Sequence, residues 1–584
     1  MEHAQTVKKS IPAALKALLG NGPYMLSLTL TAVIAYGFSV AHNSISVDDF
    51  TSEIYYPWGG DMVAQGRFTI VLFAHIFRML KNVPYFCDVL SVVCFALAAM
   101  LFCIFFDRAM GGSLSDGAKI VFSCVLVSYP AIHEIFVYGG GNFNVCLGYV
   151  MTAAALLLFQ RWYAEKKRAA LVWLAVDLFF VVSLYESFAV VFLCGVIMLL
   201  LLNFYYNPDD AERARFGNVL GKGLVAIGIL AAAVIAEFVC GRLVLKLTGM
   251  EASVNAANSL LWLDPASNPK ELIVMLLSDY ALLYIVSAPH YLPILIFDVF
   301  VVIGLVWGVA AWIRHKNFTV CALFLSLVFL QFFLSLLGGQ VSPLRTCQQY
   351  GVYIAFLSML MFVRCNRFAS RAKKPALRRA LPVISGLLAF WLIFVQAYDL
   401  NNWLCLDVQR SEEEIAVARE IGNRLQAEYD VKNTPVLFVG NYEISESILA
   451  QCTLPQDDSL QMRVAAVFEK LGLHQVYENI STYYGKERYK FVQSSLSSYL
   501  GWAVSAFRLP NQELMKLYQY LGYDFHTVDS FADYAAYSGF CAMMPAYPDP
   551  GYIMEGDGLI IVNLGKTIPD ELSALLQDAG DAEE

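Results

Sequence analysis

Long apolar runs recur along the chain up to about residue 400, and they constrain the fold more than any other feature. Most are close to the roughly 20 residues that a helix needs to cross a bilayer. Only 15% of the 584 residues are charged, against about 25% in an ordinary soluble domain. We therefore predict a polytopic α-helical membrane protein, with spans in Tyr24–Ala41, Phe86–Phe106, Ala118–Val137, Phe143–Phe159, Ala170–Leu202, Gly223–Leu245, Tyr291–Ile313, Phe318–Leu337, Tyr350–Val363 and Leu381–Tyr398.

The stretch Ala170–Leu202 decides how many times the chain crosses. Basic segments flank it on both sides, Arg161–Arg168 before it and Asp209–Lys222 after it, and short loops rich in Lys and Arg stay in the cytoplasm. Because both ends lie on the same side, the stretch must cross twice, with a turn near Ser183–Ser187 at the outer face. The prediction is about 11 transmembrane helices, with the N-terminus cytoplasmic and the C-terminus outside.

Two outer loops and a polar tail complete the predicted organisation. Residues 1–400 form the transmembrane part, and residues 401–584 form an extracytoplasmic soluble α/β domain. In the first outer loop, 42–85, the apolar segment 68–80 is too short to cross, so we expect an interfacial helix. The outer loop 248–290 contains a second such segment, interfacial or re-entrant. In the tail, residue patterns predict helices and buried strands, at Asp407–Tyr429, Leu460–Leu471 and Gln512–Leu521 for helices and at Pro435–Gly440 and Gly558–Leu564 for strands.

This topology places a set of polar side chains at the outer face. Ionisable groups within spans cost about 2.5–3.5 kcal/mol at a helix centre, so they are usually paired or line a wet cavity. Each member also has a plain interpretation as a solvated loop residue, a turn residue or a headgroup anchor. Taken together, they combine carboxylates that can accept a hydroxyl proton with arginines suited to a phosphate. The set is Asp48, Asp49, Tyr56, Arg67, His133, Glu134, Tyr185, Glu186 and Arg345.

Such a set fits an enzyme that takes a sugar from a lipid phosphate at the outer face. The alternative is a transporter or flippase of lipid-linked sugars. Polar groups near the middle of the membrane and inverted repeats would favour that alternative. The predicted polar groups gather instead at one edge. Nothing in the charge pattern is basic enough for a nucleic-acid partner.

The first outer loop also resembles a known family. The order Asn43-x-x-Ser46-x-Asp48-Asp49, then Tyr55-Tyr56, then Gln65-Gly66-Arg67-Phe68 is similar to the bacterial Gtr type II family of serotype-converting glucosyltransferases, within the GT-C class of membrane glycosyltransferases. The segments Ser183–Phe188 and Met544–Leu564 resemble the same family. Glu186 departs from it, because glutamine is more usual at that position.

The resemblance implies a GT-C-like glycosyltransferase in the bacterial cytoplasmic (plasma) membrane. The expected donor is a polyprenyl-phosphate-linked hexose, with glucose as the expected sugar. The expected acceptor is a cell-surface glycan such as a lipopolysaccharide O-antigen. Asp48 or Asp49 would act as general base in an inverting displacement, with Arg67 and Arg345 holding the departing phosphate. Substrate contacts are assigned to the remaining members of the set, Tyr56, His133, Glu134, Tyr185 and Glu186. No cofactor is required, although a divalent cation, Mg or Mn, could bridge Asp48 or Asp49 to the phosphate.

Overall fold

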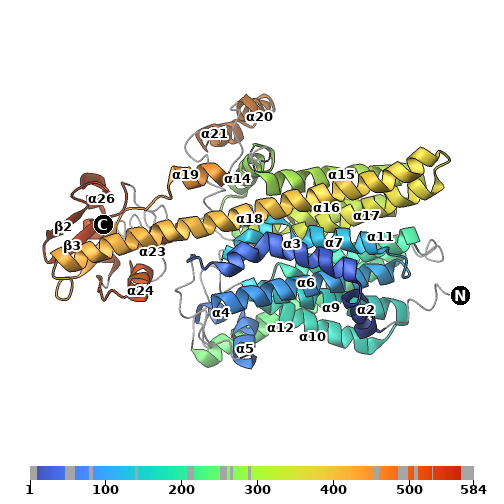
Figure 1. Cartoon of the computed structure of the whole chain (residues 1–584), viewed down its shortest axis with the longest axis horizontal. Helices are drawn as coiled ribbons and strands as arrows, with labels where there is room; N and C mark the ends of the chain where they lie inside the picture. The colour runs from blue at the N-terminus through green and yellow to red at the C-terminus, as the bar shows by residue number, and fades with distance from the viewer. Residues whose placement is uncertain are drawn as a thin grey trace.

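The computed structural model shows a helical bundle that carries a smaller α/β domain at one end (Figure 1). The structure describes residues 10–46, 60–77, 83–137, 142–206, 216–249, 260–263, 267–286, 288, 291–452, 459–483, 498–505, 511–528 and 530–566. The short helix α2 (Ile11–Leu19) lies at the end of the bundle opposite the α/β domain.

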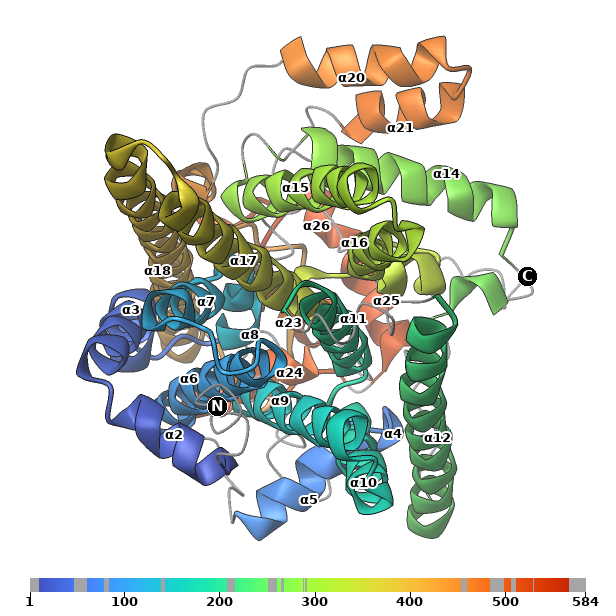
Figure 2. The same cartoon turned by 90° about the vertical axis from the view of Figure 1, so that its right-hand side faces the viewer.

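Long helices form the bundle at the predicted positions. Ten of the described helices are long and apolar enough to cross a membrane, which confirms the predicted polytopic class. The bundle helices are α3 (Gly22–Ala41), α6 (Pro84–Ala109), α7 (Asp116–Val127), α9 (Asn142–Glu165), α10 (Arg168–Leu184), α11 (Phe188–Tyr206), α12 (Phe216–Thr248), α15 (Leu292–His315), α16 (Phe318–Gly338), α17 (Gln349–Arg371) and α18 (Pro375–Glu428). Viewed end-on, most of them pack around a shared interior, while α12 stands at one edge (Figure 2).

The predicted turn inside Ala170–Leu202 is confirmed. The chain forms α10 and α11 and leaves the helical conformation only at Tyr185–Ser187 between them. α10 has 17 residues and is not among the ten. The charge pattern on either side of the stretch therefore located a break that hydropathy alone does not mark.

Local sequence sets where several helices begin and end. The side chains of Asn21 and Ser115 accept hydrogen bonds from backbone N–H groups in the first turns of α3 and α7, which satisfies donors that have no partner within the helix. At its other end, α16 stops at Gly339, whose φ of 80° is a left-handed conformation that glycine adopts without strain. These three caps thus lie close to the limits of the predicted apolar runs.

Short helices fill the loops of the bundle. The predicted interfacial helix begins at Phe68 as α5, and the helix expected in the loop 248–290 appears as α14, followed by one π-helical segment. The short elements are α4 (Gly60–Ala64), α5 (Phe68–Ile76), η1 (Pro130–Ile132), α8 (His133–Val137), η3 (Leu261–Leu263), α14 (Pro269–Tyr280), η4 (Ala281–Val286) and η5 (Leu344–Thr346).

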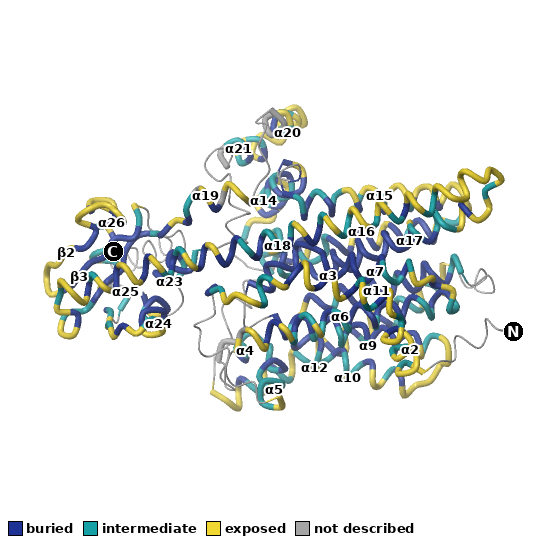
Figure 3. Tube along the Cα trace, in the orientation of Figure 1, coloured by how far each residue is buried: buried dark blue, intermediate teal, exposed yellow. Residues whose placement is uncertain are grey.

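The interior of the bundle is closely packed, and its outside is apolar. A methyl group on Gly148 of α9 would lie 2.2 Å from the ring of Phe188 of α11, so these helices approach as closely as membrane helices with small residues do. On α18, Leu387, Trp391 and Phe394 are exposed. Figure 3 shows the buried interior and the exposed outer faces. Large apolar side chains facing outward suit a lipid environment rather than water.

The C-terminal domain grows out of the last bundle helix. α18 is 54 residues long and runs past the predicted boundary at residue 401 without interruption, from the bundle into the α/β domain (Figure 1). The remaining elements include the helices and strands expected in the tail: β1 (Val436–Val439), α19 (Glu446–Leu449), η6 (Ala450–Cys452), α20 (Ser459–Lys470), α21 (His474–Tyr483), α23 (Tyr499–Ser505), α24 (Gln512–Tyr520), α25 (Phe531–Ser538), α26 (Phe540–Met543), β2 (Ile553–Gly556) and β3 (Leu559–Asn563).

The sheet of this domain has the strand order β1-β3-β2. β1 and β3 are parallel, with Val436 beside Ile560, and β2 pairs antiparallel with β3. The two residues that join β2 to β3, Asp557 and Gly558, have φ values of 53° and 77°, as a tight hairpin turn between twisted strands requires. β1 and β3 are fully buried, and the distal part of α18 packs into the same core.

Candidate functional site

The two aspartates predicted as the general base, Asp48 and Asp49, lie outside the described residues, and so does Tyr56. Their roles stay predictions from the sequence. The structure describes the chain up to Ser46 on one side of them and from Gly60 on the other. The remaining six predicted residues are all described.

Arg67 stands between the short helices α4 and α5, immediately before Phe68. Gly66 has a φ of 84°, and a methyl group there would lie 3.0 Å from a carboxylate oxygen of Glu237 in α12. Both the left-handed backbone and the close carboxylate favour glycine at this position. The Gln65-Gly66-Arg67-Phe68 motif therefore forms a tight turn that presents Arg67.

The guanidinium of Arg67 packs against the turn between α10 and α11. It lies 4.6 Å from the centre of the Tyr185 ring, and its Nη2 is 3.6 Å from a carboxylate oxygen of Glu186. Arg67 is only 25% exposed, and its Nε has no hydrogen-bond partner among the described residues. A cation held by an aromatic face and one carboxylate keeps N–H donors available for an anion.

Contacts along α5 hold this turn in place. Thr69 and Ser183 are joined by a hydrogen bond between their buried hydroxyls, and Phe68 lies 5.7 Å from Phe179, measured between ring centres. Both contacts link α5 to α10. The predicted interfacial helix thus lies against the bundle next to the α10–α11 turn.

A second pair of predicted residues, Glu134 and Arg345, meets through the backbone. Glu134 is 3% exposed and accepts a hydrogen bond of 2.7 Å from the backbone N–H of Arg345. The carbonyl of Arg345 accepts one of 2.5 Å from the side chain of Gln348, which in turn accepts one from the hydroxyl of Ser187. Gln348 therefore connects the Arg345 turn to the α10–α11 turn.

Tyr185 is the point where these two groups meet. Burial raises the pKa of its phenol, the positive charges of Arg67 and Arg345 lower it, and the negative charges of Glu186 and Glu134 raise it. All four charges act on this one side chain, although they come from segments up to 278 residues apart (345 − 67). The raised pKa keeps Tyr185 protonated at neutral pH, as a hydroxyl donor.

His133 is fully buried and packs within the interior of the protein. Its Nδ1 lies 2.8 Å from the carbonyl oxygen of Pro130. Its ring stacks on Trp403 of α18, with 4.5 Å between ring centres. These contacts fit a structural residue that packs the start of α8, which also carries Glu134, against α18.

Sequence reasoning missed three polar groups near this end of the bundle. Glu237 of α12 approaches Gly66 and lies within electrostatic range of Glu186. Asp88 of α6 is buried and accepts a hydrogen bond from Asn142. Gln348 joins the two turns described above. Glu237 and Asp88 had a visible signal, because each is a carboxylate near or within an apolar run. Gln348 had none.

No group of three potential metal ligands among His, Cys, Asp and Glu occurs in the described part of the chain. Asp48 and Asp49, the predicted ligands of a divalent cation, are not part of that description. The cation stays a prediction.

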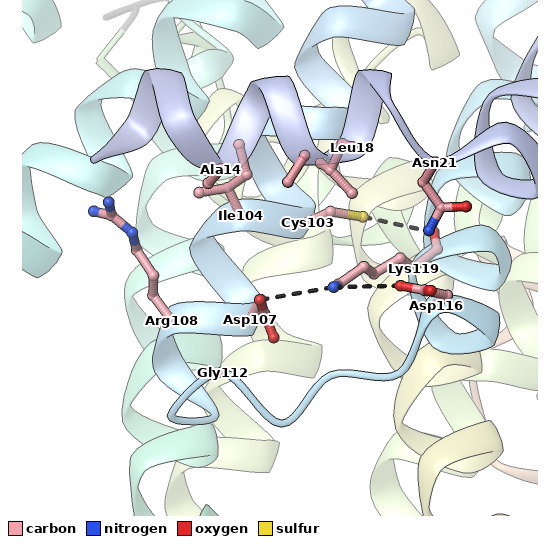
Figure 4. A pocket seen from close by; sticks show the side chains of 11 residues that line it. Ala14, Leu18, Asn21, Cys103, Ile104, Asp107, Arg108, Gly112, Asp116 and Lys119 are labelled. Carbon is pink, nitrogen blue, oxygen red and sulfur yellow. Dashed lines mark hydrogen bonds and ion pairs between the residues drawn. The ribbon is translucent and has the colours of Figure 1, made fainter. Parts of the chain in front are cut away.

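A polar pocket of about 190 Å³ opens at the other end of the bundle, between α2, α6 and α7 (Figure 4). Lys119 lies in it between two carboxylates, 3.7 Å from Asp107 and 3.6 Å from Asp116. Because it lies at the opposite end of the bundle, the pocket is separate from the Arg67 group.

Comparison with known proteins finds similar solved structures and a protein family. The crystal structure of an oligosaccharyltransferase from Archaeoglobus fulgidus, in its apo form, aligns with 73% of this chain at 11% identity and a TM-score of 0.37. The aligned region spans 63% of that protein, so less than two thirds of its length is matched.

No curated protein matches the sequence. Residues 37–362 match the protein family described as "Glucosyl transferase GtrII". This match covers more than half of the chain and includes the first outer loop, Glu134, the α10–α11 turn and Arg345. The chain therefore belongs to the GtrII glucosyl transferase family.

Proposed function

We propose that the protein is a GT-C-type glycosyltransferase that moves a hexose from a polyprenyl phosphate to a cell-surface glycan. Glucose is the hexose that we propose. Transfer takes place at the outer face of a bacterial plasma membrane. The family supplies the reaction class. The lipid-linked donor follows from the outer-face location, because nucleotide sugars are cytoplasmic.

The proposed chemistry is a single displacement with inversion. The acceptor hydroxyl attacks the anomeric carbon, and Asp48 or Asp49 takes its proton as general base. The bond between the anomeric carbon and the phosphate oxygen breaks, and the polyprenyl phosphate leaves with the bonding electrons. Charge builds up on the sugar as an oxocarbenium ion and on the departing phosphate, so donors aimed at that phosphate lower the barrier.

One observation supports this assignment most strongly: the arrangement around Tyr185. Arg67 is held by the Tyr185 ring at 4.6 Å and by Glu186 at 3.6 Å, and the charge of Arg345 also acts on the phenol. One cation in contact with a protonated phenol and a second cation within electrostatic range of it form a suitable site for a phosphate diester. In this proposal Arg67 and Arg345 contact the phosphate, and Tyr185 donates a hydrogen bond to it or to the sugar.

The donor class can be tested directly. Purified protein in lipid nanodiscs is supplied with an acceptor glycan and either radiolabelled polyprenyl-phosphate-glucose or radiolabelled UDP-glucose. Transfer from the lipid-linked donor alone is the expected result. Transfer from UDP-glucose, or from neither donor nor any other polyprenyl-phosphate hexose, contradicts the proposal.

A further inference from the structure

The stretch of α18 that leaves the bundle contains a buried ionic group. Asp407, Arg410 and Glu414 occupy successive turns of the helix, and each is at most 3% exposed. Arg410 Nη2 lies 2.8 Å from Asp407, and Arg410 Nη1 lies 2.5 Å from Glu414. Burying three charges is costly, and such groups are weak evidence of stability. Their other contacts are therefore the informative part.

One of these contacts, together with one from the neighbouring Ser411, reaches the start of the first outer loop. Arg410 Nη2 donates a hydrogen bond of 2.5 Å to the backbone carbonyl of Ile45. The backbone N–H of Ile45 donates one of 2.7 Å to the hydroxyl of Ser411. Both polar backbone groups of one loop residue are thus bound by adjacent residues of α18.

The side chain of Ile45 is also fixed, because it is buried. It is 6% exposed and belongs to the hydrophobic core of the C-terminal domain, together with Val417 and Ile421 of α18 and the residues of β1 and β3. Burying one such aliphatic side chain contributes about 1.5–3 kcal/mol. A residue of the first outer loop is therefore part of the core of a domain that begins more than 350 residues later in the sequence.

The same ionic group continues into the C-terminal domain. The Glu414 carboxylate accepts hydrogen bonds from the Ser498 hydroxyl at 2.5 Å, and from the backbone N–H groups of Tyr499 at 3.1 Å and Leu500 at 3.2 Å. These residues lie at the start of α23. Arg410 thus bridges the loop at Ile45 to α23 through Glu414.

Nearer the bundle, α18 contacts the segment that carries Glu134. Trp403 stacks on His133, the residue before Glu134, and it precedes Arg410 by seven residues. Seven residues of α-helix rise about 10 Å. One rigid helix therefore supports both the Glu134 segment and the start of the first outer loop, at a fixed spacing.

We propose that Arg410 is a positioning residue. It ties the first outer loop to the C-terminal domain and so helps to position the aspartate that deprotonates the acceptor hydroxyl. Asp48 and Asp49 follow Ile45 by three and four residues, so the anchor at Ile45 fixes the point from which the segment with both carboxylates starts. The catalytic consequence rests on the proposed function. The structural link between loop and domain does not.

The test compares Arg410→Ala with Arg410→Lys and with the control Arg424→Ala. Arg424 lies on the same helix and pairs with Glu428 at 3.1 Å, but it is 38% exposed and away from the loop. For each variant, kcat and KM for the lipid-linked donor are measured in nanodiscs, and hydrogen exchange is followed in the peptides that contain Ile45 and Tyr499.

We expect Arg410→Ala to lower kcat by about a hundredfold, the size of effect that a misplacement of about 1 Å produces, with KM for the donor changed less than threefold or so. Exchange at Ile45 and Tyr499 rises. Arg410→Lys recovers part of kcat, and Arg424→Ala matches the wild type in both measurements. Wild-type kcat together with unchanged exchange at Ile45 in Arg410→Ala overturns the proposal.

Ser411→Ala serves if Arg410→Ala does not fold, because it removes only the acceptor for the Ile45 N–H. We expect faster exchange at Ile45 and a lowered kcat in that variant as well, and the absence of both overturns the proposal. If the wild-type protein transfers no sugar, the proposed function fails, while the exchange measurements still decide whether Arg410 couples the loop to the domain.

Discussion

Replacing Arg67 with alanine separates a functional role from a structural one. The ion pair with Glu186 is long, at 3.6 Å, and Glu186 is 53% exposed, so it contributes at most about 1 kcal/mol to stability. The contact with the Tyr185 ring adds roughly 0.5–2 kcal/mol. We therefore expect the free energy of unfolding to fall by only about 1–2 kcal/mol.

The expected effect on catalysis is larger. Removing one preorganised donor from a developing negative charge costs about 10²–10³ in kcat. We predict a loss of that size for Arg67→Ala in a single-turnover assay with polyprenyl-phosphate-glucose, alongside a thermal unfolding measurement on the same sample. The matched control is Arg242→Ala. Arg242 is a basic residue of α12 whose guanidinium lies 5.2 Å from the centre of the Phe238 ring. Transfer by Arg67→Ala within about threefold of wild type would refute the phosphate assignment.

Three further changes probe the turn before Arg67, the Glu186 charge and the C-terminal domain. Gly66→Ala forces a left-handed alanine against Glu237, so we expect it to lower the free energy of unfolding by about 1–2 kcal/mol and to slow sugar transfer. The control Gly221→Ala, whose added methyl group meets no atom within 4 Å, should change neither quantity. Equal transfer rates in the two variants would contradict the role of the turn. Glu186→Gln replaces a half-exposed ion pair with the family's more usual residue, so transfer within about threefold of wild type is expected, and a hundredfold loss would show that the charge itself is required. Asn511→Ala removes a buried amide whose side chain donates to and accepts from the backbone of Phe438; chemical denaturation of the C-terminal domain should show a loss of about 1–3 kcal/mol, and an unchanged midpoint would exclude this role.

Much of the architecture could be predicted because it depends on local pattern. Apolar runs set the bundle helices, and the basic segments around Ala170–Leu202 located the break at Tyr185–Ser187. Buried apolar runs in the tail predicted β1 and β3, which are indeed fully buried. Each of these features is encoded in one continuous stretch of the sequence.

Long-range partners could not be predicted in the same way. Nothing near Ile45 in the sequence indicates that Arg410 binds its carbonyl, because the helical pattern after residue 407 shows which side of α18 is buried but not against what. The contact of Gly66 with Glu237 and the bridge from Ser187 to Gln348 likewise depend on how distant helices pack. The domain boundary at residue 401 was placed by a change in composition, whereas α18 crosses it as one helix.

The central claim, that a first-loop aspartate accepts the proton of the acceptor hydroxyl, is tested most directly by the single-turnover rates of Asp48→Asn and Asp49→Asn. Each variant keeps the size of the side chain and removes its basicity. We predict that one of them transfers glucose at least about a hundredfold more slowly than wild type, as expected for loss of a general base, while still binding the lipid-linked donor. Rates close to wild type in both variants, and in the double variant, would contradict the claim.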